Sequence, residues 1–149
     1  MKKFTFSLAR LHQFKESVLS KEKLTLASMR AELRTIEDKR DNVNAQCAKL
    51  ACEMKQGTQK GIKLFELQKL EYQIESSRQV IKVLEKQLAA QKALVEQQLR
   101  VVMSVKSEVS GLEKLRDKQR EEYDYAVAKE EAENIGELVS SQYARRSSQ

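Results

Sequence analysis

Apolar residues recur along this chain at alternating spacings of three and four, with polar residues between them. The first such seam comprises Leu19, Glu22, Leu26, Met29, Leu33, Ile36, Arg40, Val43, Cys47, Leu50 and Met54. The second comprises Leu67, Leu70, Ile74, Ser77, Ile81, Leu84, Leu88, Gln91, Val95, Gln98, Val102, Val105, Val109 and Leu112. This sustained spacing is typical of the a and d positions of a coiled coil. The pattern therefore predicts two long amphipathic helices.

The stretch KQGTQKG, residues 55–61, interrupts the pattern and holds two of the four glycines. Glycine commonly ends a helix, and a short polar cluster between periodic segments indicates a loop. We therefore predict one all-α domain over residues 1–149, a long antiparallel coiled-coil hairpin in which helix two extends beyond helix one. Helix one should cover about residues 8–55, the turn about 56–61 and helix two about 62–139, followed by a disordered tail from about 140 to 149. Folding near residue 59 places Leu33 close to Glu85.

Helix two is long enough to continue past the start of helix one. The stretch from about Leu112 to Leu138 is expected to lack a helix-one partner, yet it contains Leu115, Tyr123 and Ile135. Isolated helical ends are marginally stable in water, so this overhang either frays or orders on a partner protein.

The N-terminal FTFSL places Phe4, Phe6 and Leu8 two residues apart, before the helical spacing begins. In a hairpin, the chain start and the overhang lie at the same end. The two rings either fold back on helix two as a hydrophobic lid or form part of an apolar tip that enters another protein. The hairpin geometry allows both.

Composition favours a rod over a globular core. The 149 residues include no proline, and 34% of them are charged. Without proline, nothing removes a backbone donor inside a long helix. Catalytic and cofactor sites need a dry, concave surround, so we predict a protein that is not an enzyme, with no cofactor and no small-molecule substrate. No apolar run is long enough to span a membrane, and no signal peptide is evident, which predicts a cytoplasmic protein.

Charge is distributed unevenly. Residues 1–30 carry seven Lys or Arg against Glu16 and Glu22, whereas residues 121–137 carry seven acidic residues against Lys129. These runs are either solvated faces or a device that orients a charged partner. The net charge of +6 makes an RNA-binding helical hairpin an alternative. Interleaved Glu residues and only 5% aromatics argue against nucleic acid as the partner.

Candidate chemistry is sparse. His12 is the one histidine, expected at the surface or at the seam edge, so no catalytic triad is predicted. Cys47 and Cys52 are expected to be reduced apolar residues. Two cysteines and one histidine fit no standard zinc spacing, and we predict no metal site.

Both ends of the chain resemble the FliJ family of the bacterial flagellar protein-export apparatus. At the start, the resemblance is carried by Phe4, Phe6, Leu8, Leu11, Lys15, Glu16, Val18, Leu19, Glu22 and Lys23. Near the end it is carried by LEKLRDKQREEYDYAVAKEEAENIGELV, residues 112–139. Length, the single Gly-bearing turn and the longer second helix agree with that family.

The resemblance implies a coiled-coil stalk similar to that of rotary ATPases, active in flagellum biogenesis, motility and chemotaxis. The end bearing both termini would enter the hexameric export ATPase and promote its assembly and activity. The family also contacts the cytoplasmic domain of the membrane export gate and handles export chaperones. The protein would then lie at the inner face of the membrane, at the flagellar base, through its partners.

The resemblance also implies two sets of binding residues. The ATPase-facing set is Phe4, Phe6, Leu8, Leu112, Leu115, Gln119, Tyr123, Ile135 and Glu137. The gate-facing set is Leu70, Tyr72, Ile74 and Ser77. The alternatives are the equivalent stalk of a virulence type III secretion system and a generic coiled-coil scaffold that dimerises through its seams.

Overall fold

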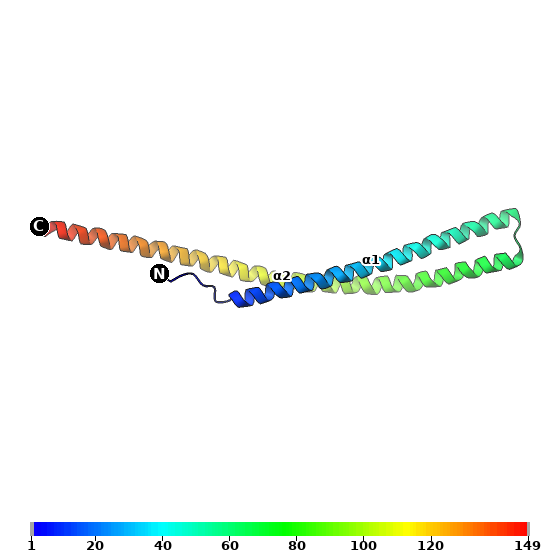
Figure 1. Ribbon diagram of the computed structural model, residues 1–149, viewed down its shortest axis with the longest axis horizontal. Helices are drawn as coiled ribbons and strands as arrows, with labels where there is room; N and C mark the ends of the chain where they lie inside the picture. The colour runs from blue at the N-terminus through cyan, green and yellow to red at the C-terminus, as the bar shows by residue number, and fades with distance from the viewer. Residues whose placement is uncertain (1, 149) are drawn as a thin grey trace. The chain divides into compact units, whose positions relative to one another are not determined.

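The structure, a computed structural model, describes residues 2–148 and consists of two helices (Figure 1). Helix α1 covers Ala9–Lys60 and helix α2 covers Leu64–Ser147. Residues 2–148 contain no strand, and a short turn reverses the chain between the helices. The prediction of an all-α antiparallel hairpin is confirmed.

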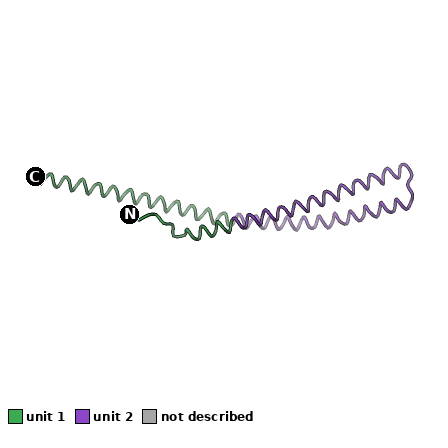
Figure 2. Tube along the Cα trace, in the orientation of Figure 1, with its two compact units in different colours: residues 1–19, 104–149 green, residues 20–103 purple. Residues whose placement is uncertain are grey.

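The chain divides into two compact units, which are described separately (Figure 2). The hairpin unit consists of residues 20–103 and includes the turn. The terminal unit consists of residues 1–19 and 104–149. No helix within residues 2–148 is long and apolar enough to cross a membrane. The expectation that the whole chain is one domain stays a prediction.

Within the hairpin unit, α1 and α2 pack along the two seams. Leu26, Ile74, Leu84, Leu88 and Val102 are buried there. All the other predicted seam positions, in both units, are buried or half-buried as well. The apolar residues that fall between the seams, such as Leu24, are exposed. The 3–4 spacing therefore identified the packing face of each helix correctly, as expected for side chains that interlock along a coiled coil.

Two glutamines occupy buried seam positions and bond across the helix pair. The Gln91 amide donates to the Met29 carbonyl at 3.0 Å and to the Glu32 carboxylate at 3.3 Å. The Gln98 amide donates to the carbonyl and the carboxylate of Glu22. A buried amide must find such partners to offset its lost hydration, and these bonds fix which residues of α1 face α2.

The turn lies further along the chain than the sequence predicted. Helix α1 continues through Gly57 to Lys60, and the reversal occupies residues 61–63. Gly61 has a φ of 84°, the left-handed conformation that ends many helices. Gly57, by contrast, remains helical, because a glycine inside a helix costs only about 1 kcal/mol relative to alanine. The expected boundaries of about 55 and 62 were therefore too early, and α1 pairs with residues slightly further along α2 than a fold at residue 59 implies.

The C-terminal end also differs from the expectation. A disordered tail was predicted from about residue 140, but α2 continues to Ser147. Arg145 and Arg146 lie in its last turn, where positive charge interacts favourably with the helix dipole. The Ser147 hydroxyl also donates to the Ala144 carbonyl at 3.0 Å.

Candidate partner-binding surfaces

In the terminal unit, residues 2–8 lie against α2 before α1 begins. The Phe4 ring packs on Tyr123 with centroids 5.6 Å apart, and the Arg120 guanidinium carbon lies 5.2 Å from the Phe4 centroid. The Tyr123 hydroxyl donates to the Lys2 carbonyl. The Ala9 amide donates to the Phe6 carbonyl and the His12 amide to the Leu8 carbonyl, which joins this segment to α1. We call residues 2–8 the N-terminal strap.

The strap answers one question that the sequence left open. Phe4, Phe6 and Leu8 are all half-buried, with Phe4 held on α2. This is the arrangement expected of a hydrophobic lid. Of the two alternatives, a lid on helix two or a tip that enters another protein, the structure therefore shows Phe4 in the first, packed within the terminal unit.

The first turns of α1 also pair with α2. Lys15 Nζ lies 2.6 Å from Glu108 Oε2, and His12 Nε2 lies 3.4 Å from Glu113 Oε1. Leu112, which was expected to begin the overhang, is half-buried here, as are Gln119 and Tyr123. Helix α1 therefore reaches slightly beyond the predicted start of the overhang, to Glu113, and the strap, which precedes α1, covers α2 further, to Tyr123.

His12 is more buried than the sequence suggested. We expected it at the surface or at the seam edge, yet it is buried, with 8% of its surface exposed. Its ring nitrogen faces carboxylates of Glu16 on α1 and Glu113 on α2. Sequence reasoning missed this grouping because the two carboxylates are about a hundred positions apart, and their proximity depends on the register of the hairpin.

Beyond Val127, every residue of α2 to Ser148 is exposed. This stretch, which we call the C-terminal arm (residues 128–148), contains Ile135, Glu137 and Leu138 of the predicted overhang. It also exposes Val139 and Tyr143, by 60% and 76%. Tyr143 was missed because residues from about 140 were expected to be disordered. The partner-free overhang is therefore shorter than predicted and begins closer to the C-terminus.

The nine residues of the predicted ATPase-facing set fall into two groups. One group lies in the part of the terminal unit that is partly covered, where Leu115 is exposed and the other members are half-buried: Phe4, Phe6, Leu8, Leu112, Gln119 and Tyr123. Ile135 and Glu137 lie on the C-terminal arm. Of the whole set, contact across the strap is made by Phe4 and Tyr123.

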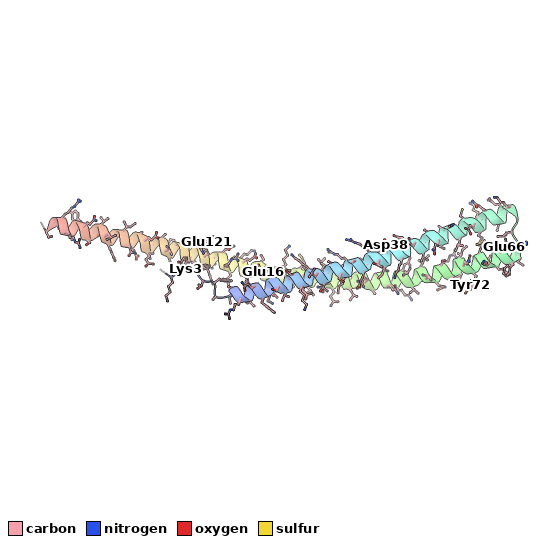
Figure 3. The ribbon with its side chains drawn as sticks, in the orientation of Figure 1. Lys3, Glu16, Asp38, Glu66, Tyr72 and Glu121 are labelled. Atoms are coloured by element: carbon pink, nitrogen blue, oxygen red, sulfur yellow. The ribbon has the colours of Figure 1, made fainter. Side chains whose placement is uncertain are left out.

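The predicted gate-facing residues lie near the turn, in the hairpin unit. Leu70, Ile74 and Ser77 are seam residues that pack toward α1. Tyr72 instead points to solvent with 75% of its surface exposed (Figure 3). Of the four, Tyr72 is thus the side chain most available to a partner.

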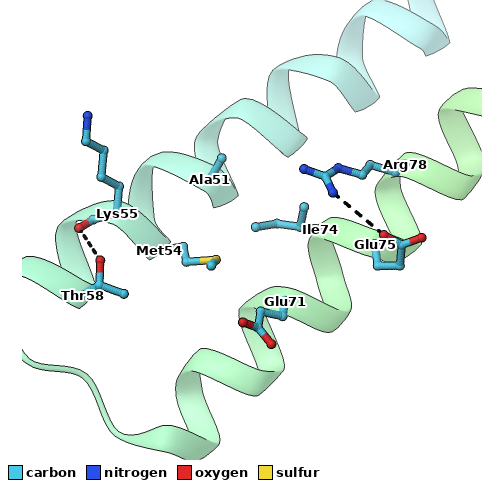
Figure 4. A pocket seen from close by; sticks show the side chains of 8 residues that line it. All are labelled: Ala51, Met54, Lys55, Thr58, Glu71, Ile74, Glu75 and Arg78. Carbon is cyan, nitrogen blue, oxygen red and sulfur yellow. Dashed lines mark hydrogen bonds and ion pairs between the residues drawn. The ribbon is translucent and has the colours of Figure 1, made fainter.

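Two open grooves flank this part of the seam. One, of about 510 Å³, is lined by Ala51, Met54, Lys55, Thr58, Glu71, Ile74, Glu75 and Arg78 (Figure 4). The other, of about 430 Å³, lies beside Tyr72 and Ser77 and is also lined by Leu50. Both grooves touch the predicted gate-facing residues.

Comparison with protein families decides the identity of the chain. The family model described as flagellar FliJ protein matches residues 4–148. The chain belongs to the FliJ family. Neither the curated proteins nor the solved structures that were compared with it gave a match.

Membership makes this FliJ chain a component of the flagellar export apparatus, from a family that is not catalytic. The match includes the strap from Phe4 onward, the seams, the turn and the C-terminal arm. The surfaces described above therefore lie almost entirely within the matched residues.

Proposed function

We propose that this FliJ-family chain is a stalk of the hexameric flagellar export ATPase, which its terminal unit enters and whose assembly and activity it promotes. The observation that carries the proposal is the C-terminal arm. It exposes large apolar side chains on a helix that nothing within residues 2–148 covers.

Four large apolar side chains of α2 near and within the arm share one face. At about 100° per residue, Tyr125, Ile135, Val139 and Tyr143 fall within about 80° of one another around the helix axis. Each is at least 60% exposed. A contiguous apolar stripe on an otherwise polar helix is typical of an interaction surface. Seven acidic residues among positions 121–137 surround this face. These features support insertion into a protein channel with an apolar lining and basic residues.

The strap has a supporting role in this proposal. Phe4 packs on Tyr123, so the strap adds apolar surface beside α2 where the arm begins. Phe6, Leu8 and Leu115 enlarge that surface. Half-buried rings are already ordered in the free protein, which lowers the entropic cost of binding. We therefore include the strap in the ATPase-facing surface, as a preformed part.

We further propose that the hairpin unit carries the contact with the export gate. Tyr72 is exposed, and the groove beside it contains Leu50 and Ser77. Exposed aromatic side chains next to a groove are common anchors of protein interfaces. Contact with export chaperones is proposed from the family alone, and the protein is expected at the cytoplasmic base of the flagellum through these partners.

ATP hydrolysis by the flagellar export ATPase from the same organism tests the stalk proposal. The full chain is expected to stimulate hydrolysis, whereas a chain ending at Ala128 should not, because it lacks the arm while keeping the strap contacts. Circular dichroism and urea unfolding should show that the truncated chain keeps the hairpin.

Point variants make the same test without removing residues. Ile135→Ser with Val139→Ser should lower stimulation by roughly tenfold or more, since buried apolar anchors are each worth about 1–2 kcal/mol or more. The matched control is Val80→Ser with Val83→Ser, which removes two exposed β-branched apolar side chains of similar size from the hairpin unit. Equal stimulation by all variants, with the ATPase shown to be active, would reject the arm as the binding surface.

A further inference from the structure

Three ligand atoms converge near the start of α1, outside the surfaces assigned to protein partners. His12 Nε2 lies 3.3 Å from Glu16 Oε1 and 3.4 Å from Glu113 Oε1. All three atoms lie within 4.8 Å of one another. The cluster belongs entirely to the terminal unit.

Regular helical geometry holds the three side chains in place. His12 and Glu16 are four residues apart on α1, so they lie one above the other on the same helix face. Glu113 reaches them from α2. The ion pair between Lys15 and Glu108, at 2.6 Å, holds the two helices together beside the cluster. A site built from rigid helices keeps its ligands close to a fixed geometry.

The distances from the histidine nitrogen also fit a shared metal ion. Protein N–H···O bonds are most often about 2.9–3.0 Å long, so 3.3 and 3.4 Å are long for the His12 contacts. In a tetrahedral zinc site with metal–ligand bonds of about 2.0–2.2 Å, neighbouring ligand atoms are about 3.3–3.5 Å apart. Both distances from the histidine nitrogen therefore match the edge of such a tetrahedron.

The ligand types narrow the choice of metal. Imidazole favours Zn²⁺ and other transition metals over Mg²⁺ and Ca²⁺, which prefer oxygen ligands alone. Two carboxylates also balance the charge of a divalent ion. The Glu16 and Glu113 side chains are 51% and 44% exposed, whereas the His12 side chain is 11% exposed. An ion can thus approach from the carboxylate side, and a water molecule can complete the fourth position.

We propose that His12, Glu16 and Glu113 bind Zn²⁺ and that the ion clamps the first turns of α1 to α2. The clamp lies next to the strap, because the His12 amide also bonds to the Leu8 carbonyl. Zinc binding therefore stabilises the terminal unit and fixes the point from which the strap departs. This inference is independent of which protein the terminal unit enters.

Titration calorimetry of the full chain with Zn²⁺ tests the site. One ion per chain should bind, and Glu113→Gln, which keeps the size of the side chain, should weaken binding by roughly tenfold or more. His12→Ala should weaken it at least as much. Glu122→Gln is the matched control, because it removes an exposed carboxylate of α2 in the same unit that is not a ligand, and it should leave zinc affinity unchanged.

Cysteine is the main competing ligand for zinc. Cys47 and Cys52 are free thiols of the hairpin unit. Zinc affinity should therefore be retained in a Cys47→Ser, Cys52→Ser chain. Co²⁺ in place of Zn²⁺ should give the visible absorption of a four-coordinate site with nitrogen and oxygen ligands. This absorption should disappear in Glu113→Gln.

Urea unfolding gives a readout that does not depend on calorimetry. Zinc should raise the unfolding midpoint of the full chain and of Glu122→Gln, but not of Glu113→Gln. The proposal is overturned if the chain does not bind Zn²⁺, if Glu113→Gln binds it as tightly as the unchanged chain, or if the cysteine substitutions abolish binding.

Discussion

Phe4 is held in place by contacts with residues that are distant in the sequence, and a sequence pattern does not reveal such contacts. Its ring packs against Tyr123 and beneath the Arg120 guanidinium, while the Tyr123 hydroxyl bonds to the Lys2 carbonyl. An aromatic pair is worth about 0.5–1.5 kcal/mol beyond its buried area, and an exposed cation–π contact about 0.5–1 kcal/mol. The strap is thus held by a small number of modest contacts centred on one ring.

Phe4→Ala should therefore release the strap without unfolding the helices. The expected result is faster hydrogen exchange at the Ala9 and His12 amides, which bond to strap carbonyls, by roughly tenfold for a loss of about 1.4 kcal/mol. Far-UV circular dichroism should stay close to that of the unchanged chain. Phe14→Ala is the control, because Phe14 is 61% exposed on the neighbouring helix, and it should not alter exchange at either amide. Unchanged exchange in Phe4→Ala would mean that the ring does not hold the strap.

At the scale of the element, the glycine of the turn and a glycine inside α2 have opposite roles. Gly61 has a left-handed backbone, whereas Gly111 lies inside α2 with open space where a Cβ would be. An alanine at Gly61 is strained whatever the space around it, since L-residues disfavour positive φ. An alanine at Gly111 meets no neighbour within 4 Å and limits the freedom of the unfolded chain.

Gly61→Ala should therefore lower the free energy of unfolding by about 1–2 kcal/mol, and Gly111→Ala should raise it by about 0.5–1 kcal/mol. Urea unfolding followed by circular dichroism measures both. Gly61→Asn should recover part of the loss, because asparagine tolerates the left-handed region better than alanine. If Gly61→Ala and Gly111→Ala shift stability in the same direction, the assignment of the turn to Gly61 is incorrect.

The same elements show which parts of the fold could be predicted from the sequence and which could not. The seams were predictable because the 3–4 spacing repeats over many turns, and even the charged and polar members Glu22, Arg40 and Gln98 lie on the packing face. The turn was placed too early because Gly57 and Gly61 look alike in a sequence, and only backbone conformation separates them. The last turns of α2 were missed, although Val139 and Tyr143 continue the four-residue spacing from Ile135, because the polar residues from about 140 were interpreted as a tail.

The candidate sites were predictable only in part, for a related reason. Apolar residues at the two ends allowed the start of the chain to fold back on helix two, as one of two alternatives, and Phe4 and Tyr123 do meet. Their role as a lid and the grouping of His12 with Glu113 depend on register across the hairpin. A shift of a few residues along α2 separates these pairs, and such a shift is within the error of a turn placed from glycine positions.

At the scale of the whole molecule, the N-terminal residues carry net positive charge and residues 121–137 carry net negative charge. The net charge is +6, yet residues 121–137 sum to −6, with three of the glutamates at positions 130, 131 and 133. Charges of this kind act mainly on the rate of encounter with a partner and on its orientation, and salt screens them over about 10 Å at 0.1 M. An acidic segment next to an apolar stripe is therefore expected to speed the entry of α2 into a basic channel.

A triple variant of the arm should associate with the export ATPase roughly two- to tenfold more slowly at low salt. It carries Glu130→Gln, Glu131→Gln and Glu133→Gln. Stopped-flow or surface-based kinetics measures the rate, and about 0.5 M salt should remove most of the difference. The control is Glu66→Gln, Glu71→Gln and Glu75→Gln, which changes net charge equally in the hairpin unit. If the two triple variants slow association equally, the net charge of the chain is the cause. If only the arm variant is slow, the position of the charge matters, because the attraction then acts on the segment that enters first.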